Sequence, residues 1–277
     1  MTLSNQLIAQ QTSFATAEKA ADALYQAIDT RNAPIIKELF GTENTYLLPL
    51  DEVDDEDIKQ FIDAWKTSHK VTTNDNKNYY IEVGLKQWTF PVPLIKQGEV
   101  WIFDTISGAE NILIRQIGRN ELATIQTVLA YYDAQQEYAE QDRNNDGILE
   151  YAQKFRSTNG KKDGLYWPAE AGDPLSPLGS LLENRTPETA YQGYYYKILT
   201  AQGNYAEGGA VNYIIGKHMT AGFALLAWPA EYGESGVISF MINHKGIVYE
   251  KDLGEETQQK AELIKQFDPD SSWHKLQ

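Results

Sequence analysis

Hydrophobic residues recur at helical spacing in three short segments near the start of the chain. The first segment covers residues 20–28, and Thr16 stands where a side chain would cap its N-terminus. A second helix is expected to start near Pro34 and end at Gly41, since proline suits the first turn and glycine the end. The third should follow the acidic run 51–57, whose carboxylates favour the positive end of a helix dipole. This interpretation is preferred to a metal site, because nothing in the run orders the carboxylates around an ion.

The segments that follow alternate hydrophobic and polar residues, as strands do. We expect three strands of an antiparallel meander, at residues 79–83, 87–90 and 100–103. The proline-containing segment PVPLI suits an edge or a bend. Residues 18–117 are therefore predicted to form an α+β domain whose sheet is covered by helices on one face, an order that resembles the pocket-forming nuclear-transport-factor-like domains. Residues 1–17 are polar and rich in Gln, and we expect a tail of low order there.

A longer amphipathic helix should begin at Gly118 and lead into a second domain, residues 118–277. The apolar stripe of this helix is expected at Leu122, Ile125, Leu129 and Tyr132, widened by Val128 and Tyr131. Beyond it, alternating strands are joined by glycine turns, with a hairpin turn at residues 244–246 and a last amphipathic helix at residues 256–267. The predicted fold class is α+β, with two domains that each pack an antiparallel sheet with helices. A long helix leading into a sheet also resembles the globular parts of pilin-like proteins.

Composition and charge limit the partners of this chain. Its 277 residues are 42% hydrophobic and 12% aromatic, which is enough for packed cores. The 24 basic and 39 acidic residues give a formal charge of −15, which disfavours nucleic acid and anionic membrane surfaces as partners. There is no cysteine, which excludes disulfides and thiolate metal sites. The longest apolar run, residues 222–230, is far too short for a transmembrane segment, and the N-terminus as written carries no export signal.

An acidic loop after the long helix is the candidate ion site of the sequence. The segment DRNNDGILE, residues 142–150, places side-chain oxygens at alternate positions of a turning backbone. Glycine at the sixth position permits the sharp turn that lets these oxygens converge on one point, as in calcium loops. The candidate calcium ligands are Asp142, Asn144, Asp146, the backbone carbonyl of Ile148, and Glu150.

A second interpretation of this loop stays open. Position 12 is Gln153 and not the bidentate glutamate of a calcium loop, so both charge and ligand number are low. Asp and Asn side chains also accept hydrogen bonds from their own backbone, so an ion-free turn accounts for the same residues.

The acidic residues Glu137, Glu140 and Asp142 crowd the end of the helix, where the dipole disfavours negative charge. We therefore expect a local cation to offset them.

Catalytic motifs are not found in the sequence. It lacks G-x-S-x-G, H-E-x-x-H and phosphate-binding glycine motifs, and its histidines are scattered without ligand spacing, at His69, His218, His244 and His274. Asp163 and Glu231 could act as acid and base on a glycoside if they shared a cleft, with His218 as a further catalytic candidate. For Glu231 and His218 a structural role is the simpler interpretation. Tyr166 and Trp167 could stack on a flat ligand such as a sugar ring, although core packing is again preferred.

Several segments resemble the blocks of a bacterial family called domain of unknown function 2950. The likeness extends from Phe14 to Trp273 and is densest from Gly118 onward. The segments that carry it are GRNELATIQTVLAYYDAQQEYA, DRNNDGILEYAQKFRST, GKKDGLYWPA, PLSPLGSL, YQGYYYKILTAQG, GGAVNYIIGKHMTAGFALLAWPAEYGESGVISFMINHKGIVYEKDLG and FDPDSSW.

The resemblance implies a location and leaves the activity open. Members usually carry an export signal, which implies an extracytoplasmic, periplasmic protein, although this chain shows no such signal. Three hypotheses follow. The first is a non-enzymatic binding or structural module that calcium stabilises, with an envelope protein or glycan as partner. The second is a hydrolase acting on cell-envelope glycan through Asp163 and Glu231, and the third is a pilin-like assembly subunit. We favour the first because it requires no missing motif.

Overall fold

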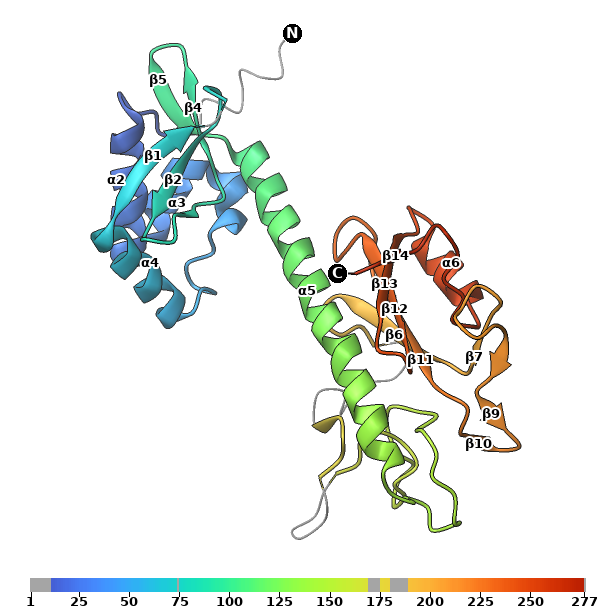
Figure 1. The fold of residues 1–277 in the computed structure, drawn as a ribbon. Coiled ribbons are helices and arrows are strands. Elements are labelled where there is room, and N and C mark those ends of the chain that lie inside the picture. The colour runs from blue at the N-terminus through green and yellow to red at the C-terminus, as the bar shows by residue number, and fades with distance from the viewer. Residues whose placement is uncertain (1–10, 74, 169–174, 180–188, 277) are drawn as a thin grey trace. The chain divides into compact units, whose positions relative to one another are not determined.

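The computed structural model describes residues 11–73, 75–168, 175–179 and 189–276. Contacts between Cα atoms divide the chain into two compact units, Met1–Arg115 and Gln116–Gln277 (Figure 1). Helices combine with antiparallel sheets, which confirms the predicted α+β class. Among the described residues, no helix has the length and hydrophobicity needed to cross a membrane.

Four helical segments open the first unit, and their ends follow the capping residues of the sequence. Thr16 caps the first helix by accepting a hydrogen bond from the Lys19 amide at 3.2 Å, as predicted. Asn32 caps the second in the same way, with Pro34 in its first turn and Gly41 at its C-terminal end. The segments are α2 (Ala17–Asp29), α3 (Ala33–Phe40), the 3-10 helix η2 (Thr42–Leu47) and α4 (Asp55–Thr67).

An antiparallel sheet completes the first unit. Its strands are β1 (His69–Thr73), β2 (Tyr79–Val83), β3 (Trp88–Thr89), β4 (Leu94–Gln97) and β5 (Val100–Phe103). The order is β1-β2-β4-β5, with β3 also paired to β2. The strands at 79–83 and 100–103 have their predicted bounds, whereas β1 was not expected. The segment expected at an edge or a bend contributes β4, which pairs with β5 along its whole length.

The end of the predicted N-terminal tail belongs to the first unit, so the expectation of low order is wrong for residues 11–17. Phe14 and Trp101 exchange two backbone hydrogen bonds of 2.8 Å. The Gln11 side chain donates a hydrogen bond to the Phe40 carbonyl at 3.0 Å. Backbone pairing fixes this segment although its sequence is polar. Residues 1–10 lie outside the described part of the chain.

The long helix α5 (Thr105–Ala139) begins earlier than the predicted start at Gly118. Asp104 supplies the start signal, because its carboxylate accepts hydrogen bonds from the amides of Ile106 and Ser107. Gly108 does not end the helix. A Cβ atom at this position would lie 2.8 Å from a methyl carbon of Val92, so the glycine permits close packing.

The buried face of α5 in the second unit also differs from the predicted stripe. Leu122 is 66% exposed, and Ile125, Leu129 and Tyr132 are only partly buried. The buried residues are Thr124, Thr127, Val128, Tyr131, Ala134, Gln135 and Tyr138. Polar members of this face find partners inside the protein; the Thr127 hydroxyl, for example, donates to the Ala123 carbonyl at 2.8 Å. Val128 and Tyr131, which were expected to widen the stripe, are buried, but the polar members of the face were missed by a search for apolar spacing alone.

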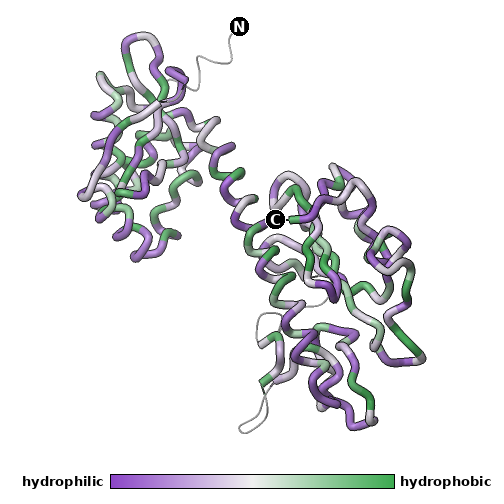
Figure 2. Tube along the Cα trace, viewed as in Figure 1, coloured by the Kyte–Doolittle hydropathy of each residue, from purple (hydrophilic) through white to green (hydrophobic). Residues whose placement is uncertain are grey.

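The main sheet of the second unit has the strand order β14-β13-β12-β11-β6 and is antiparallel throughout. Its strands are β6 (Tyr194–Leu199), β11 (Ala224–Pro229), β12 (Ile238–Asn243), β13 (Val248–Asp252) and β14 (His274–Lys275). Every residue of β11 is buried, and hydrophobic residues gather along the central strands (Figure 2). The Tyr131 hydroxyl of α5 donates to the Ala224 carbonyl, which joins the helix to β11.

Shorter elements surround this sheet. Two ribbons are formed by β7 (Ala201–Gln202) with β8 (Val211–Asn212), and by β9 (Ile214–Ile215) with β10 (His218–Met219). The hairpin between β12 and β13 turns at residues 244–246, as predicted. The last helix, α6 (Thr257–Leu263), is shorter than the predicted 256–267, because the chain is already extended at Ile264.

Candidate metal centre

Strong contacts fix the chain on the C-terminal side of the acidic loop 142–150. Tyr151 forms an antiparallel bridge with Met219 of β10, and its amide donates to the Met219 carbonyl at 2.8 Å. Gln135 of α5 is fully buried, and its side chain bonds both the amide and the carbonyl of Ala152 at 2.8 Å. The loop is thus held between the end of α5 and the β9–β10 ribbon.

Within the loop, side-chain oxygens turn the backbone. The Asp142 carboxylate accepts hydrogen bonds from the amides of Asp146 at 3.2 Å and Gly147 at 2.8 Å. Asp146 in turn accepts a hydrogen bond from the Ile148 amide at 3.0 Å. Gly147 has a φ of +87°, a conformation that glycine adopts without strain. The backbone hydrogen bonds, from Gly147 above all, hold the pKa of Asp142 below its usual value.

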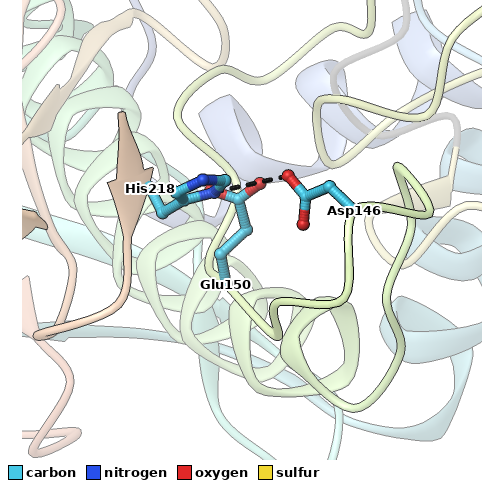
Figure 3. A group of neighbouring side chains, drawn as sticks. All are labelled: Asp146, Glu150 and His218. Carbon is cyan, nitrogen blue, oxygen red and sulfur yellow. Dashed lines mark ion pairs between the residues drawn. The ribbon is translucent and has the colours of Figure 1, made fainter. Parts of the chain in front are cut away.

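These turns direct two carboxylates toward a histidine from the β9–β10 ribbon (Figure 3). The Nδ1 atom of His218 lies 3.3 Å from Oε2 of Glu150 and 3.6 Å from Oδ2 of Asp146. The three donor atoms lie within 4.8 Å of one another. The side chains of His218 and Glu150 are only 13% and 14% exposed. This group of Asp146, Glu150 and His218 is named the loop–ribbon cluster below.

Two neighbours orient the carboxylates of the loop–ribbon cluster. The Asn144 amide nitrogen donates to Oδ2 of Asp146 at 3.0 Å and to Oε1 of Glu150 at 2.9 Å. The backbone amide of Met219 donates to Oε2 of Glu150 at 3.3 Å. Such outer contacts hold ligand side chains in place at metal sites.

His218 has no ligand spacing in the sequence, yet it lies beside Asp146 and Glu150 in the structure. Ligand spacing is a local test, but His218 lies far from the loop in sequence and reaches it through the pairing of Tyr151 with Met219. A sequence signal existed in the motif IIGKHM, in which a glycine turn between two short strands places the histidine at the start of the second strand, at a ribbon end. That signal gave no indication of which acidic loop the ribbon would meet.

Other residues of the predicted site have different roles. Gln153 donates from its side chain to the Lys217 carbonyl at 2.7 Å, so it fastens the loop to the ribbon and lies outside the cluster. Ile148 contributes its amide to Asp146. The local cation expected beside the acidic helix end is Arg143, whose guanidinium donates to the carbonyls of Glu137 and Tyr138.

The loop–ribbon cluster fits a divalent cation. Carboxylate oxygens and neutral imidazole are common metal ligands, and two carboxylates so close together repel each other without a positive charge between them. Among the described residues, the buried Nδ1 of His218 has no hydrogen-bond partner, although it points at both carboxylates. A buried imidazole nitrogen that faces two carboxylates in this way can act as the third ligand of an ion.

The catalytic candidates Asp163 and Glu231 have separate surroundings. Asp163 accepts hydrogen bonds from the Thr158 amide at 2.7 Å and from Nζ of Lys154 at 2.8 Å. Burial raises its pKa, but these hydrogen bonds outweigh burial and the pKa is lowered overall. Glu231 is exposed in a tight turn, where its backbone carbonyl accepts from the Ser235 amide. An ionised, hydrogen-bonded Asp163 is not suited to donate a proton as a general acid.

The two candidate stacking residues are buried. Tyr166 is 6% and Trp167 is 4% exposed. The guanidinium of Arg143 lies 5.5 Å from the centre of a Trp167 ring, and Nζ of Lys162 lies 5.8 Å from it. Core packing with cation–π contacts therefore explains these aromatics without a bound ligand.

Comparison with known proteins gives one match. The family model described as protein of unknown function (DUF2950) matches residues 11–276. No curated protein and no solved structure matches the chain. The chain therefore belongs to the DUF2950 family, in agreement with the resemblance of its sequence blocks.

Proposed function

We propose that the second unit is a binding or structural module whose acidic loop is held in place by a bound divalent cation. The observation that carries this proposal is the convergence of Asp146, Glu150 and His218 from two separate segments of the chain. A cation bound there would join the loop after α5 to the β9–β10 ribbon. Calcium was the ion expected from the loop sequence.

A structural role suits the surroundings of the loop–ribbon cluster. The neighbouring contacts of Gln135, Tyr151 and Gln153 all fasten the loop to the helix or to the ribbon. An ion between the loop and the ribbon would reinforce these attachments at a place where two carboxylates repel each other. The family resemblance is the ground for proposing that the module works outside the cytoplasm, with an envelope protein or glycan as partner.

Thermal unfolding of the metal-stripped full chain tests this proposal. A ligand that binds only the folded state stabilises it by about 2.7 kcal/mol at one hundred times its dissociation constant. We therefore expect at least one of calcium, magnesium, manganese or zinc to raise the midpoint of the second unit's unfolding transition by roughly 5 to 10 °C. The transition of the first unit serves as an internal reference and should not move.

A matched pair of variants separates site binding from a general effect of ions on an acidic protein. Asp146→Asn removes a carboxylate of the cluster and should abolish most of the shift. Asp55→Asn removes a carboxylate that pairs with Arg31 at the surface of the first unit, and the shift should persist. If none of the four ions moves either transition, the proposed cation-bound module is wrong.

The hydrolase and pilin-like hypotheses have less support. A glycosidase needs one carboxyl group that is protonated at working pH, and the pKa of Asp163 is lowered. Assembly by the pilin-like route rests on a general likeness of a long helix followed by a sheet. The cation-bound module accounts for a specific arrangement of three side chains.

A further inference from the structure

The donor atoms of the loop–ribbon cluster identify the class of cation that it takes. We infer that this site selects a first-row transition ion of the zinc class in preference to calcium, with His218 as the residue that decides the selectivity. This inference rests on the proposed function, because it names the ion of the same site. It departs from the calcium ion that the loop sequence favours.

Calcium requires more oxygen ligands than the loop directs to one point. A calcium ion takes six to eight oxygens. Both oxygens of the Asp142 carboxylate already accept backbone hydrogen bonds, and Asn144 turns its amide nitrogen toward Asp146 and Glu150. At position 12, Gln153 is bonded to the ribbon. Of the side chains expected as calcium ligands, Asp146 and Glu150 are the two that face His218.

An imidazole nitrogen is the third donor, and it changes the preference of the site. Calcium and magnesium prefer oxygen ligands, whereas imidazole suits zinc, iron, nickel and copper. The Nδ1 atom of His218 is directed at both carboxylates. A histidine in this position weakens a calcium site and completes a three-ligand zinc site.

The two distances from the histidine to the carboxylates agree with a small ion. Tetrahedral zinc with nitrogen and oxygen ligands at 2.0–2.2 Å places neighbouring donor atoms about 3.4 Å apart. The two distances from Nδ1 of His218, 3.3 Å to Glu150 and 3.6 Å to Asp146, are close to this separation. The two carboxylates and the imidazole would fill three of four positions, and water would take the fourth.

Titration calorimetry of the metal-stripped full chain with zinc chloride and with calcium chloride tests the inference. We expect one zinc ion per chain, bound at least about 100-fold more tightly than calcium. His218→Asn should weaken zinc binding by about 100-fold or more, since even outer-contact substitutions cost up to that factor. The same variant should leave calcium affinity within about threefold of the unsubstituted chain.

A matched histidine variant and a spectroscopic reading complete the experiment. His274→Asn alters an exposed histidine of β14 and should leave zinc binding unchanged. Cobalt(II) provides a second readout, because its visible bands report a tetrahedral site with a nitrogen ligand, and these bands should disappear in His218→Asn. Glu150→Gln should also remove the bands, and it provides the test should His218→Asn fail to fold.

The outcomes separate this inference from the proposed function. If calcium binds more tightly than zinc, or if His218→Asn leaves zinc affinity unchanged, the zinc-class assignment is wrong while the cation-bound module stands. If no divalent ion binds the chain, both are wrong. Zinc binding that depends on both His218 and Glu150 supports both.

Discussion

Two acidic segments of this protein, residues 51–57 and 142–150, differ in the groups that their carboxylates contact. The first segment has six acidic residues and the second has three. In the first, all six are exposed at the start of α4, where Asp55 pairs with Arg31 at the surface. In the second, Asp142 turns the backbone, and Asp146 and Glu150 face a histidine from another element. Under our proposal, a backbone turn and an opposing element therefore matter more for an ion site than the number of carboxylates.

The largest expected effect comes from removing the support behind the second segment. Gln135→Ala leaves the buried amide and carbonyl of Ala152 without their partners. The loss of two buried hydrogen bonds should lower the free energy of unfolding by about 3 kcal/mol. Urea unfolding of the second unit measures this change. Gln126→Ala, at an exposed position of the same helix, is the control and should change stability by less than about 0.5 kcal/mol. A small effect of Gln135→Ala would mean that the loop does not depend on the helix.

A smaller effect on stability is expected from a substitution in the turn of the acidic loop. Gly147→Ala places a side chain at a φ of +87°, with open space around the new Cβ atom, so backbone strain is the main cost. We expect a loss of about 1 kcal/mol and weaker cation binding, measured by thermal unfolding with and without the ion. Gly118→Ala is the matched control, since its Cβ also meets open space but lies in a helix. That substitution should stabilise the chain slightly. If Gly147→Ala and Gly118→Ala change the stability equally, a side chain at position 147 does not strain the turn.

The smallest expected effect is on the pH dependence of the second unit's stability. The pKa of Asp142 is lowered in the folded state by backbone hydrogen bonds, chiefly from Gly147. A lowered folded-state pKa adds stability above the unfolded value of about 4, and this stability is lost as pH falls through the folded-state pKa. In the absence of divalent ions, the midpoint temperature of the second unit's unfolding should fall as the pH is lowered from about 4 to about 2. The fall should be less steep in Asp142→Asn than in the unsubstituted chain. Thermal unfolding across this range measures it, with Asp55→Asn as the comparison from the first segment. Identical acid profiles for Asp142→Asn and the unsubstituted chain would contradict the role given to Asp142.

Local signals in the sequence predicted much of the fold. Thr16, Pro34 and Gly41 marked helix ends that the structure confirms, because capping depends on residues within one turn. The strands at 79–83 and 100–103 and the hairpin turn at 244–246 followed from alternation and turn residues in the same way. These features need no knowledge of distant parts of the chain.

Features that depend on distant contacts were not predicted. The early start of α5 was not predicted, because the close contact that requires glycine at position 108 is with Val92, in a distant part of the chain. The burial of Gln135 was not predicted, because its partners on Ala152 lie beyond the loop. His218 looked isolated for the same reason, and the pairing of β10 with Tyr151 places it beside the acidic loop. The sequence therefore predicted the carboxylates of the candidate site but not its histidine.

The packing of α5 on β11 has a consequence for how the chain is made. Tyr131 of the helix bonds Ala224 of the strand, so this contact between α5 and β11 must wait for the chain to extend from Ala139 to Ala224. At synthesis rates of about 5–20 residues per second, that interval lasts roughly 4 to 17 seconds. Until then, the part of α5 that packs on β11 lacks its partner, although the contacts of Gln135 with Ala152 and of Tyr138 with Lys162 can already form.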